Sequence, residues 1–278
     1  MLISSISVAQ STVNMVSNPS FEDVWEYPFT MNQLKLTKGW FPFGTADPSP
    51  DFFHAACFNE AMGIPKNLFG RQMAHSGEAY IGLITYLTSK SGRGWQIPIN
   101  HREFAMATLS KPLVAGNEYY AEMYVNLADN CEYSIDNIGM YFTQDMPTFD
   151  WKVMNFHHYK AQVSSPRGVA LNNHEGWTKI SGTFVAKGDE MALSIGTFAP
   201  DSALKLTKTK RKFSHQRDKR TPKNLQPQIA YYFVDDIVVR PVDPQESIYP
   251  PESPIASKDP DSPFGPIEIG KKVTLQNI

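Results

Sequence analysis

Carboxylates near the two ends of the sequence are of the type that binds hard metal ions. Glu22 and Asp23 lie in the segment NPSFED, and Asp235 and Asp236 are adjacent in the segment YYFVDDIVVR. Several carboxylate oxygens brought together form the kind of ligand set that Ca²⁺ prefers. If the N-terminal segment lies beside the last strand, these residues could bind a structural calcium ion.

Asp235 has a second candidate role, because its place in the segment predicts apolar surroundings. The residues expected to share its face of a strand are Tyr231, Phe233, Ile237 and Val239. A buried carboxylate is costly unless a cation, a metal ion or hydrogen-bond donors compensate it. Two alternatives therefore stay open: Asp235 binds a metal ion, or it accepts hydrogen bonds from a neighbouring turn.

Four aromatic residues could bind a sugar, because flat rings stack on the C–H faces of sugars beside a few fixed polar groups. Tyr120 and Tyr124 lie on the polar face of a predicted strand, Tyr141 lies on another strand, and Trp95 lies in a Gly-rich loop. We expect these side chains to form a platform on one sheet. The alternative is that a second sheet or a long loop covers them, which would make them packing residues.

No motif in the sequence indicates an enzyme. The nucleophile elbow of hydrolases, the zinc motif of metalloproteases and the phosphate-binding loop are all missing. A carboxylate pair for glycoside hydrolysis can always be chosen from 28 acidic residues. Sequence spacing, however, does not establish the separation of roughly 5 to 9 Å that this chemistry needs. We therefore expect a non-catalytic protein.

The two cysteines, Cys57 and Cys131, could form one disulfide if the chain is exported. Closing such a long loop would stabilise the fold by up to ~4 kcal/mol in the chain-entropy model. The alternative is two separate buried thiols, because sequence does not give the distance between their Cα atoms.

These residues must be positioned by strands rather than helices. The chain is 12% aromatic with 17 glycines and 21 prolines, which favours short strands and turns. Strict alternation of apolar and polar residues runs through 118–128. Further alternating segments are 79–86, 102–109, 134–143, 177–186, 190–198 and 230–239. With no amphipathic helix of 12 residues, the pattern predicts an all-β, antiparallel two-sheet sandwich over residues 10–240.

The two ends of the chain differ in composition from the middle. Residues 1–9, MLISSISVA, are typical of the end of a secretory signal peptide, although the positively charged first part is missing. Residues 241–266 contain eight of the 21 prolines and predict an extended linker. Residues 267–278, IEIGKKVTLQNI, alternate like the start of a further domain. No apolar run of 18 residues predicts a membrane span.

The net charge of −2 conceals an uneven distribution. Residues 205–223 contain nine Lys or Arg and one Asp. The remaining 17 basic and 27 acidic residues give the rest of the chain a net charge of −10. Because Phe213 is the only aromatic residue among the basic ones and the rest of the chain is acidic, we expect a solvated loop between two strands and no nucleic-acid partner.

Two segments resemble galactose-binding-like jelly rolls, the fold of many carbohydrate-binding modules. They are Asn-Pro-Ser-Phe-Glu near the start, with Gly39 and Trp40 soon after, and Tyr-Tyr-Phe-Val-Asp-Asp-Ile-Val-Val in the last strand. In those modules similar segments often lie together at a structural calcium ion. The resemblance implies a jelly-roll sandwich with long loops, and it implies Glu22 with Asp235 or Asp236 as candidate calcium ligands.

A longer match is similar to the N-terminal exported domain of OmpA-family proteins of Bacteroidetes-type bacteria. Its segments include NPSFED, PDFFHAACF, IPKNLFGRQMAHSGEAYIGL, YSIDNIGMYF and YYFVDDIVV, in this order. In that family a linker and a peptidoglycan-binding domain follow the jelly roll. Because the sequence ends at Ile278, where that domain would begin, peptidoglycan binding is expected only of a longer parent.

The resemblance implies a protein of the periplasm, outer membrane or cell surface that binds a glycan or another envelope component. Two alternatives stay open. One is a structural or protein-interaction domain of the envelope without a sugar site. The other is a jelly roll associated with a hydrolase.

Overall fold

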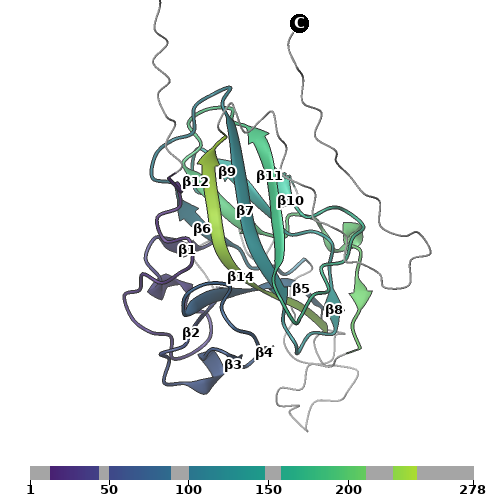
Figure 1. Cartoon of the computed structure of the whole chain (residues 1–278). Helices are drawn as coiled ribbons and strands as arrows, with labels where there is room; N and C mark the ends of the chain where they lie inside the picture. Colours follow the sequence, from purple (N-terminus) through teal and green to yellow (C-terminus); the bar gives the residue numbers. More distant parts are fainter. Residues whose placement is uncertain (1–12, 44–49, 89–99, 148–157, 211–227, 243–278) are drawn as a thin grey trace, which may run out of the picture. The chain divides into compact units, whose positions relative to one another are not determined.

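The computed structural model describes residues 13–43, 50–88, 100–147, 158–210 and 228–242 (Figure 1). All of them belong to one unit, Met1–Val242. The predicted signal remnant and terminal segment lie outside the described residues, as do the predicted linker from residue 243 onward and most of the basic stretch 205–223.

Two five-stranded antiparallel sheets form a sandwich, so the predicted all-β jelly-roll architecture is confirmed (Figure 1). The first sheet has the order β1 (Trp40–Pro42), β6 (Ala105–Thr108), β12 (Ala192–Gly196), β9 (Gly139–Thr143) and β10 (Val163–Ser164). The second sheet has the order β11 (Thr178–Val185), β7 (Glu118–Leu127), β14 (Gln228–Pro241), β5 (Ala79–Thr88) and β2 (Asp51–His54). Strands far apart in the sequence, such as β14 and β5, are therefore neighbours.

Short elements connect and cover the two sheets. Two small antiparallel pairs join β3 (Lys66–Asn67) to β4 (Gly70–Arg71), and β8 (Tyr133–Ser134) to β13 (Thr207–Lys208). Three 3₁₀ turns are η1 (Leu34–Leu36), η2 (Glu60–Met62) and η3 (Asp201–Ala203). Over the described ranges, no helix is long and apolar enough to cross a membrane.

The core lies between the two sheets, where the inward side chains of each sheet meet. Phe142 of β9 stacks on Phe184 of β11 with ring centroids 4.5 Å apart, which joins the sheets directly. The other central core residues include Ala105, Ala107, Met140, Leu193, Ile195, Ala121, Met123, Val125, Ile180 and Val234. Each large apolar side chain buried here stabilises the fold by about 1.5–3 kcal/mol.

Strand β7 shows how closely alternation in the sequence predicts burial. Its residues alternate between half-buried and buried from Glu118 to Val125, with Tyr119, Ala121 and Met123 in the core. The opposite residues therefore lie on the outer face of the second sheet, as predicted.

The alternating segment 134–143 forms two strands, β8 and β9, instead of one. The residues between them leave the sheet, because Asp136 accepts hydrogen bonds from the backbone N–H groups of Gly168 and Lys205 at 2.6 and 2.9 Å. The hydroxyl of Tyr232 also accepts a hydrogen bond from the N–H of Ile135 at 2.9 Å. These long-range contacts outweigh the local preference for a continuous strand.

A β-bulge in β14 overturns the expectation that Asp235, Ile237 and Val239 share one face. Asp235 pairs with Tyr124, but Val239 pairs with the inward-facing Ala121, and the register shifts between them. One extra residue in β14 changes the side to which the following side chains point. Asp235 therefore shares the outer side with Phe233, while Val239 faces the core between the sheets.

Residues 55–78 cover part of the outer face of the second sheet. The ring of Phe69 stacks on that of Tyr231 with centroids 3.6 Å apart. The hydroxyl of Tyr80 donates to the carbonyl of Gln72 at 3.2 Å. The second sheet is thus buried on both sides along β14 and β5. This explains why Tyr231, Tyr232 and Phe233, which point alternately to the two sides, are all buried.

Two acidic residues, Asp51 and Glu103, are buried near each other and are each only 3% exposed. Asp51 accepts hydrogen bonds from the Tyr231 hydroxyl at 2.6 Å and the Asn32 N–H at 2.7 Å. Burial raises the pKa of Asp51 to about 6, although these donors oppose the shift. Burial and the nearby Asp51 also raise the pKa of Glu103 well above its ordinary value.

We expect the free energy of unfolding to fall as the pH rises from about 4 to about 7. A carboxyl group whose pKa is raised in the folded state binds more protons there than in the unfolded chain, so its stabilising effect is lost as it ionises. Asp51 alone would contribute ~3 kcal/mol to this loss, at 1.36 kcal/mol for each pKa unit. The replacement Asp51→Asn should reduce the loss, as measured by urea unfolding at several pH values.

The matched control is Asp145→Asn, because Asp145 is exposed. It should leave the pH dependence unchanged. An unchanged dependence in Asp51→Asn would show that Asp51 does not titrate in this range.

Candidate functional site

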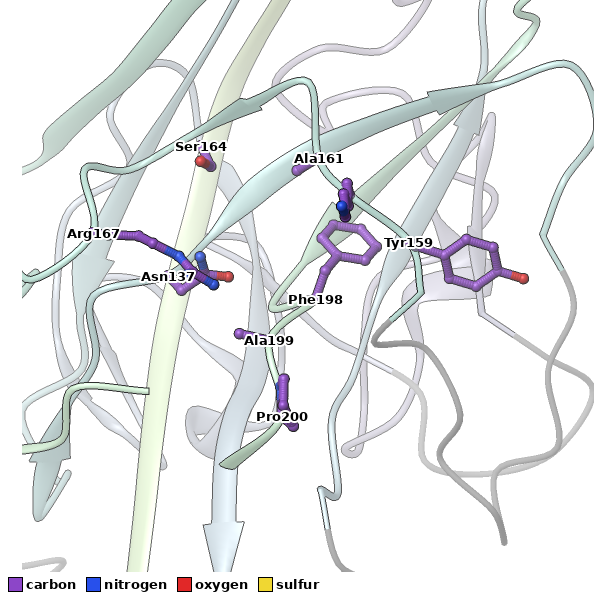
Figure 2. A pocket seen from close by; sticks show the side chains of 9 residues that line it. Asn137, Tyr159, Ala161, Ser164, Arg167, Phe198, Ala199 and Pro200 are labelled. Atoms are coloured by element: carbon purple, nitrogen blue, oxygen red, sulfur yellow. The ribbon is translucent and has the colours of Figure 1, made fainter. Parts of the chain in front are cut away.

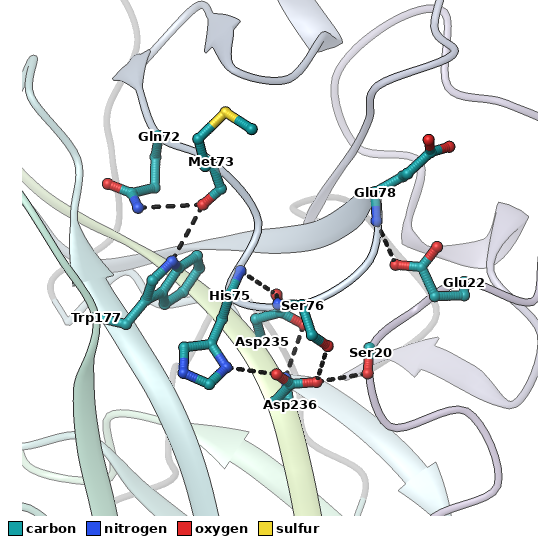
Figure 3. A network of polar contacts seen from close by, with 10 residues as sticks. All are labelled: Ser20, Glu22, Gln72, Met73, His75, Ser76, Glu78, Trp177, Asp235 and Asp236. Carbon is teal, nitrogen blue, oxygen red and sulfur yellow. Dashed lines mark hydrogen bonds and ion pairs between the residues drawn. The ribbon is translucent and has the colours of Figure 1, made fainter.

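Asp235 accepts hydrogen bonds from a neighbouring turn, the second of the two roles left open by the sequence (Figure 3). Its Oδ2 accepts from the backbone N–H groups of His75 at 2.8 Å and Ser76 at 3.3 Å. Its Oδ1 accepts from the N–H of Asp236 at 2.7 Å. Burial and the charge of Asp236 raise the pKa of Asp235 to about 8, and the three N–H donors limit this shift.

Asp236 binds the same turn from the other side of the bulge. It has a positive φ of 47°, so the strand turns its carboxylate toward the loop. The hydroxyls of Ser20 and Ser76 donate to its Oδ1, each at 2.6 Å, and His75 Nδ1 contacts its Oδ2. Burial raises the pKa of Asp236, but these hydrogen bonds outweigh burial and hold it below its ordinary value.

Glu22 also binds this loop, at a point beyond Ser76. Its Oε1 accepts from the N–H groups of Glu78 at 2.9 Å and Ala79 at 3.0 Å (Figure 3). The loop requires a glycine at position 77, just before these two residues. Its φ is +64°, and a Cβ atom there would lie 2.2 Å from Glu22 Oε1. The N-terminal segment, the loop and β14 are therefore held together, as the sequence predicted.

The carboxylates in this arrangement are occupied by hydrogen bonds. Glu22, Asp235 and Asp236 each accept hydrogen bonds from N–H or O–H donors. In the part of the chain that the structure describes, no three His, Cys, Asp or Glu residues are placed to hold a metal ion. A structural calcium ion at this place stays a prediction.

The predicted aromatic platform on one sheet is wrong, because its residues lie on different sheets. Tyr120 and Tyr124 lie on β7 in the second sheet, while Tyr141 lies on β9 in the first. Trp95 lies outside the described residues. Alternation in sequence predicts the face of a strand, but it does not predict the sheet to which that strand belongs.

The two tyrosines of the second sheet already contact other side chains. The ring of Tyr124 stacks on His75 with centroids 3.6 Å apart, and the edge of Trp177 meets His75 at 6.0 Å. The guanidinium of Arg240 lies 4.9 Å from the ring centroid of Tyr120. For Tyr124 the alternative role is thus confirmed, because the loop that carries His75 covers one side of its ring.

The two cysteines are free thiols, so the candidate disulfide is not present and the alternative of separate thiols is observed. Cys57 donates to the carbonyl of Pro28 at 2.7 Å. Cys131 is buried, and its Sγ lies 3.6 Å from the carbonyl oxygen of Tyr231. Each thiol packs in its own surroundings.

Tyr141 belongs to an aromatic cluster on the outer face of the first sheet. Its ring lies 5.2 Å from that of Tyr159 and 5.6 Å from that of Phe198. Phe104 and Met106 pack beneath these rings in the same cluster. On this face the half-buried side chains of Tyr141 and Tyr159 therefore pack against buried apolar residues.

A pocket of about 350 Å³ opens beside this cluster (Figure 2). Phe198 and Tyr159 form its apolar part, while Asn137 and Arg167 lie toward its other end (Figure 2). The remaining lining residues are Lys160, Ala161, Ser164, Ala199 and Pro200. Aromatic and polar residues thus line one pocket.

A second pocket of about 430 Å³ lies along the same strands, and Lys160 lines both. Tyr141 is part of its wall. Its polar lining residues include Gln144, His158, Gln162, Lys187 and Glu190. The segment that carries Tyr159 and Lys160 therefore separates two neighbouring hollows.

Tyr159 and Phe198 were not predicted from the sequence. The signal for Phe198 lies in β12, where the outward residues Ser194 and Gly196 are small. A Cβ atom at Gly196 would lie 2.3 Å from Phe104 Cδ1, so this strand needs a glycine to make room for the aromatic cluster. Small residues on the outer face of a strand thus indicate that large side chains from elsewhere in the chain pack over that face.

The sequence matches no protein-family model and no curated protein. Among solved structures, it is similar to the N-terminal endo-1,4-β-D-xylanase 10B of Clostridium thermocellum, in its CBM22-1–GH10 modules. The identity is 11%, the TM-score is 0.40, and the match covers 84% of this chain and 29% of that one. The chain thus corresponds to less than a third of that structure.

Two further solved structures are similar at the same remote level. The CBM22-1 xylan-binding domain of Paenibacillus barcinonensis Xyn10C is 11% identical, with 84% of this chain and 98% of that one covered and a TM-score of 0.38. The K1 cleaved adhesin domain of Lys-gingipain from Porphyromonas gingivalis is 10% identical, with 74% and 92% covered and a TM-score of 0.37.

Calcium binding at the loop can be tested by thermal unfolding with and without EDTA. If the ion is present, EDTA lowers the melting temperature of the unaltered protein, and Glu22→Ala removes the difference. Glu22→Gln separates the two roles, because it keeps an oxygen to accept the two N–H groups but loses the charge that Ca²⁺ prefers.

If hydrogen bonding is the only role, Glu22→Ala destabilises the fold by about 1–3 kcal/mol and Glu22→Gln by much less. EDTA then has no effect on any of the three proteins. That result would exclude the calcium ion.

Proposed function

We propose that this domain is a non-catalytic module that binds a glycan at the outer face of the first sheet. The observation that carries the proposal is the pocket that Tyr159 and Phe198 line together with Asn137 and Arg167. Sugars have apolar C–H faces and polar hydroxyl groups, and a site for them must offer partners for both.

The polar groups of the pocket are available to a ligand. Across the described residues, the Asn137 amide and the Ser164 hydroxyl make no side-chain hydrogen bond, and both line the pocket. An amide offers both donors and an acceptor, and a hydroxyl can do either. Together with the neighbouring rings, they provide directional contacts beside an apolar surface.

Binding without catalysis fits the placement of the acidic residues. Asp51 and Glu103 have raised pKa values, which is a feature of catalytic acids. Both are almost fully buried beside Tyr231, however, and neither lines the pocket. A polysaccharide bound in the pocket therefore does not reach Asp51 or Glu103.

The setting that we propose is the envelope of a bacterial cell. Support comes from the signal-like segment at residues 1–9 and from the resemblance to exported OmpA-family domains. Peptidoglycan would be bound only through a further C-terminal domain of the kind found in that family. Fractionation of cells that express the native gene should find the protein in the periplasm, the outer membrane or at the cell surface.

A second candidate function, protein interaction, is favoured by exposed apolar side chains at one edge of the domain. Trp25 is 71% exposed, Phe29 62% and Phe58 100%. These segments are adjacent, because the Asn59 amide donates to the Phe29 carbonyl at 2.8 Å. If the domain binds no glycan, Trp25→Ala with Phe29→Ala should abolish its association with a partner purified from envelope fractions.

The proposed glycan site is tested by replacing Tyr159. A glycan array identifies a ligand, and calorimetry then compares Tyr159→Ala with the unaltered protein. Loss of one stacking ring, worth about 1.4 kcal/mol, should weaken binding about tenfold. The fold should be retained, because Tyr159 is only half-buried.

Tyr124→Ala is the matched control, because it removes a half-buried tyrosine from the outer face of the other sheet. It should leave the affinity unchanged. Loss of binding in Tyr124→Ala alone would move the site to the second sheet, and no binding to any glycan would reject the proposal.

A further inference from the structure

The charged side chains that line the first pocket are Lys160 and Arg167, and both are cations. Among the described residues, no acidic side chain lines this pocket. The protein as a whole carries a net charge of −2, so the cationic lining of this pocket does not reflect an excess of basic residues in the chain. The positive charge belongs to the pocket itself.

Neither cation is neutralised by a carboxylate. The ion pairs within the described ranges join His75 to Asp236, Arg102 to Asp201 and Lys179 to Glu122. Lys160 and Arg167 take part in none of them, nor in a side-chain hydrogen bond to any described residue. Their charges are therefore available to a ligand.

Asp136, an acidic residue next to the pocket lining in the sequence, is occupied by backbone donors. Asp136 precedes the lining residue Asn137, and its two oxygens accept from the N–H groups of Gly168 and Lys205. These contacts direct its carboxylate to the backbone next to Arg167. The loop thus directs the Asp136 carboxylate to backbone N–H groups and not to the Arg167 guanidinium.

The neighbouring pocket has the same tendency. It adds Lys187 to Lys160, and its one acidic residue is Glu190. The two oxygens of Glu190 accept from the N–H groups of Lys187 and Gly188, each at 2.8 Å. The carboxylate of Glu190 is therefore committed to the turn, while the ammonium groups remain on the surface.

We infer that the ligand at this site is an acidic glycan whose anionic group binds between Lys160 and Arg167. The inference rests on the proposed function, because it names the class of glycan that the same pocket takes. A guanidinium presents a planar fork of donors that matches the oxygens of a carboxylate, sulfate or phosphate group, and an ammonium adds a point charge. A hollow lined by one sign of charge strengthens the attraction.

The rings and the cations have separate roles in this arrangement. Tyr159 and Phe198 contact the sugar ring, which neutral and acidic glycans share. Lys160 and Arg167 contact the group that only the acidic glycan carries. Removing the cations should therefore abolish the preference for an acidic polymer and leave weaker binding of the neutral one.

The test uses two pairs of polymers that differ in charge: polygalacturonate with its carboxyl-reduced product, and dextran sulfate with dextran. Affinities are measured by calorimetry at about 0.15 M salt, where long-range attraction is screened. The unaltered protein should bind one acidic polymer at least tenfold more tightly than its neutral partner. The pair that shows this difference identifies the anion as a carboxylate or a sulfate.

The double variant Lys160→Gln with Arg167→Gln should lose this preference. Its matched control is Lys66→Gln with Arg71→Gln, which removes the same two charges from the exposed cross-strand pair of β3 and β4. The control should keep the preference, and circular dichroism should show both variants folded.

The outcomes separate the inference from the proposed function. Equal affinity for the acidic and neutral polymers would overturn the inference and leave glycan binding in place. Equal weakening in the two double variants would also overturn it, because the attraction would then depend on total charge. Binding to none of the four polymers would overturn the inference, whereas the proposed function is rejected only if the glycan array also shows no binding.

Discussion

The burial of Asp235 is the constraint on which the packing of the N-terminal segment and the His75–Ser76 turn against β14 depends. A carboxylate that is fully buried must find hydrogen-bond donors. The structure provides them by bringing the turn at His75 and Ser76 against the bulge of β14. Glu22 then holds the far end of the same loop, so that one buried carboxyl group helps to fix the relation between the N-terminal segment, the loop and the last strand.

This arrangement makes the two outer faces of the sandwich different. The loop that satisfies Asp235 continues from residues that cover β14 and β5, and His75 itself stacks on Tyr124. The outer face of the second sheet is therefore largely used for packing. The first sheet is covered by an aromatic cluster that leaves pockets at its edge, and its unpaired polar and basic groups are the better surface for a ligand.

The strands were predictable because their signal is local. Alternation from Glu118 to Val125 predicted burial in β7 residue by residue, since every second side chain of a strand points to the same side. The same reasoning failed at Asp235, where one extra residue in β14 changes the side of Ile237 and Val239. Nothing in the segment YYFVDDIVV marks the bulge, because a neighbouring loop and strand stabilise it.

The sequence by itself determined the all-β sandwich, which follows from the periodicity of its strands. That Glu22 and the Asp235–Asp236 pair bind the same loop was decided by the tertiary structure. Only the tertiary structure decided that Tyr141 lies on a different sheet from Tyr120 and Tyr124, because strand order depends on contacts between distant segments. It also decided which cations are unpaired, since Asp136 and Glu190 are directed to backbone N–H groups by the loops around them.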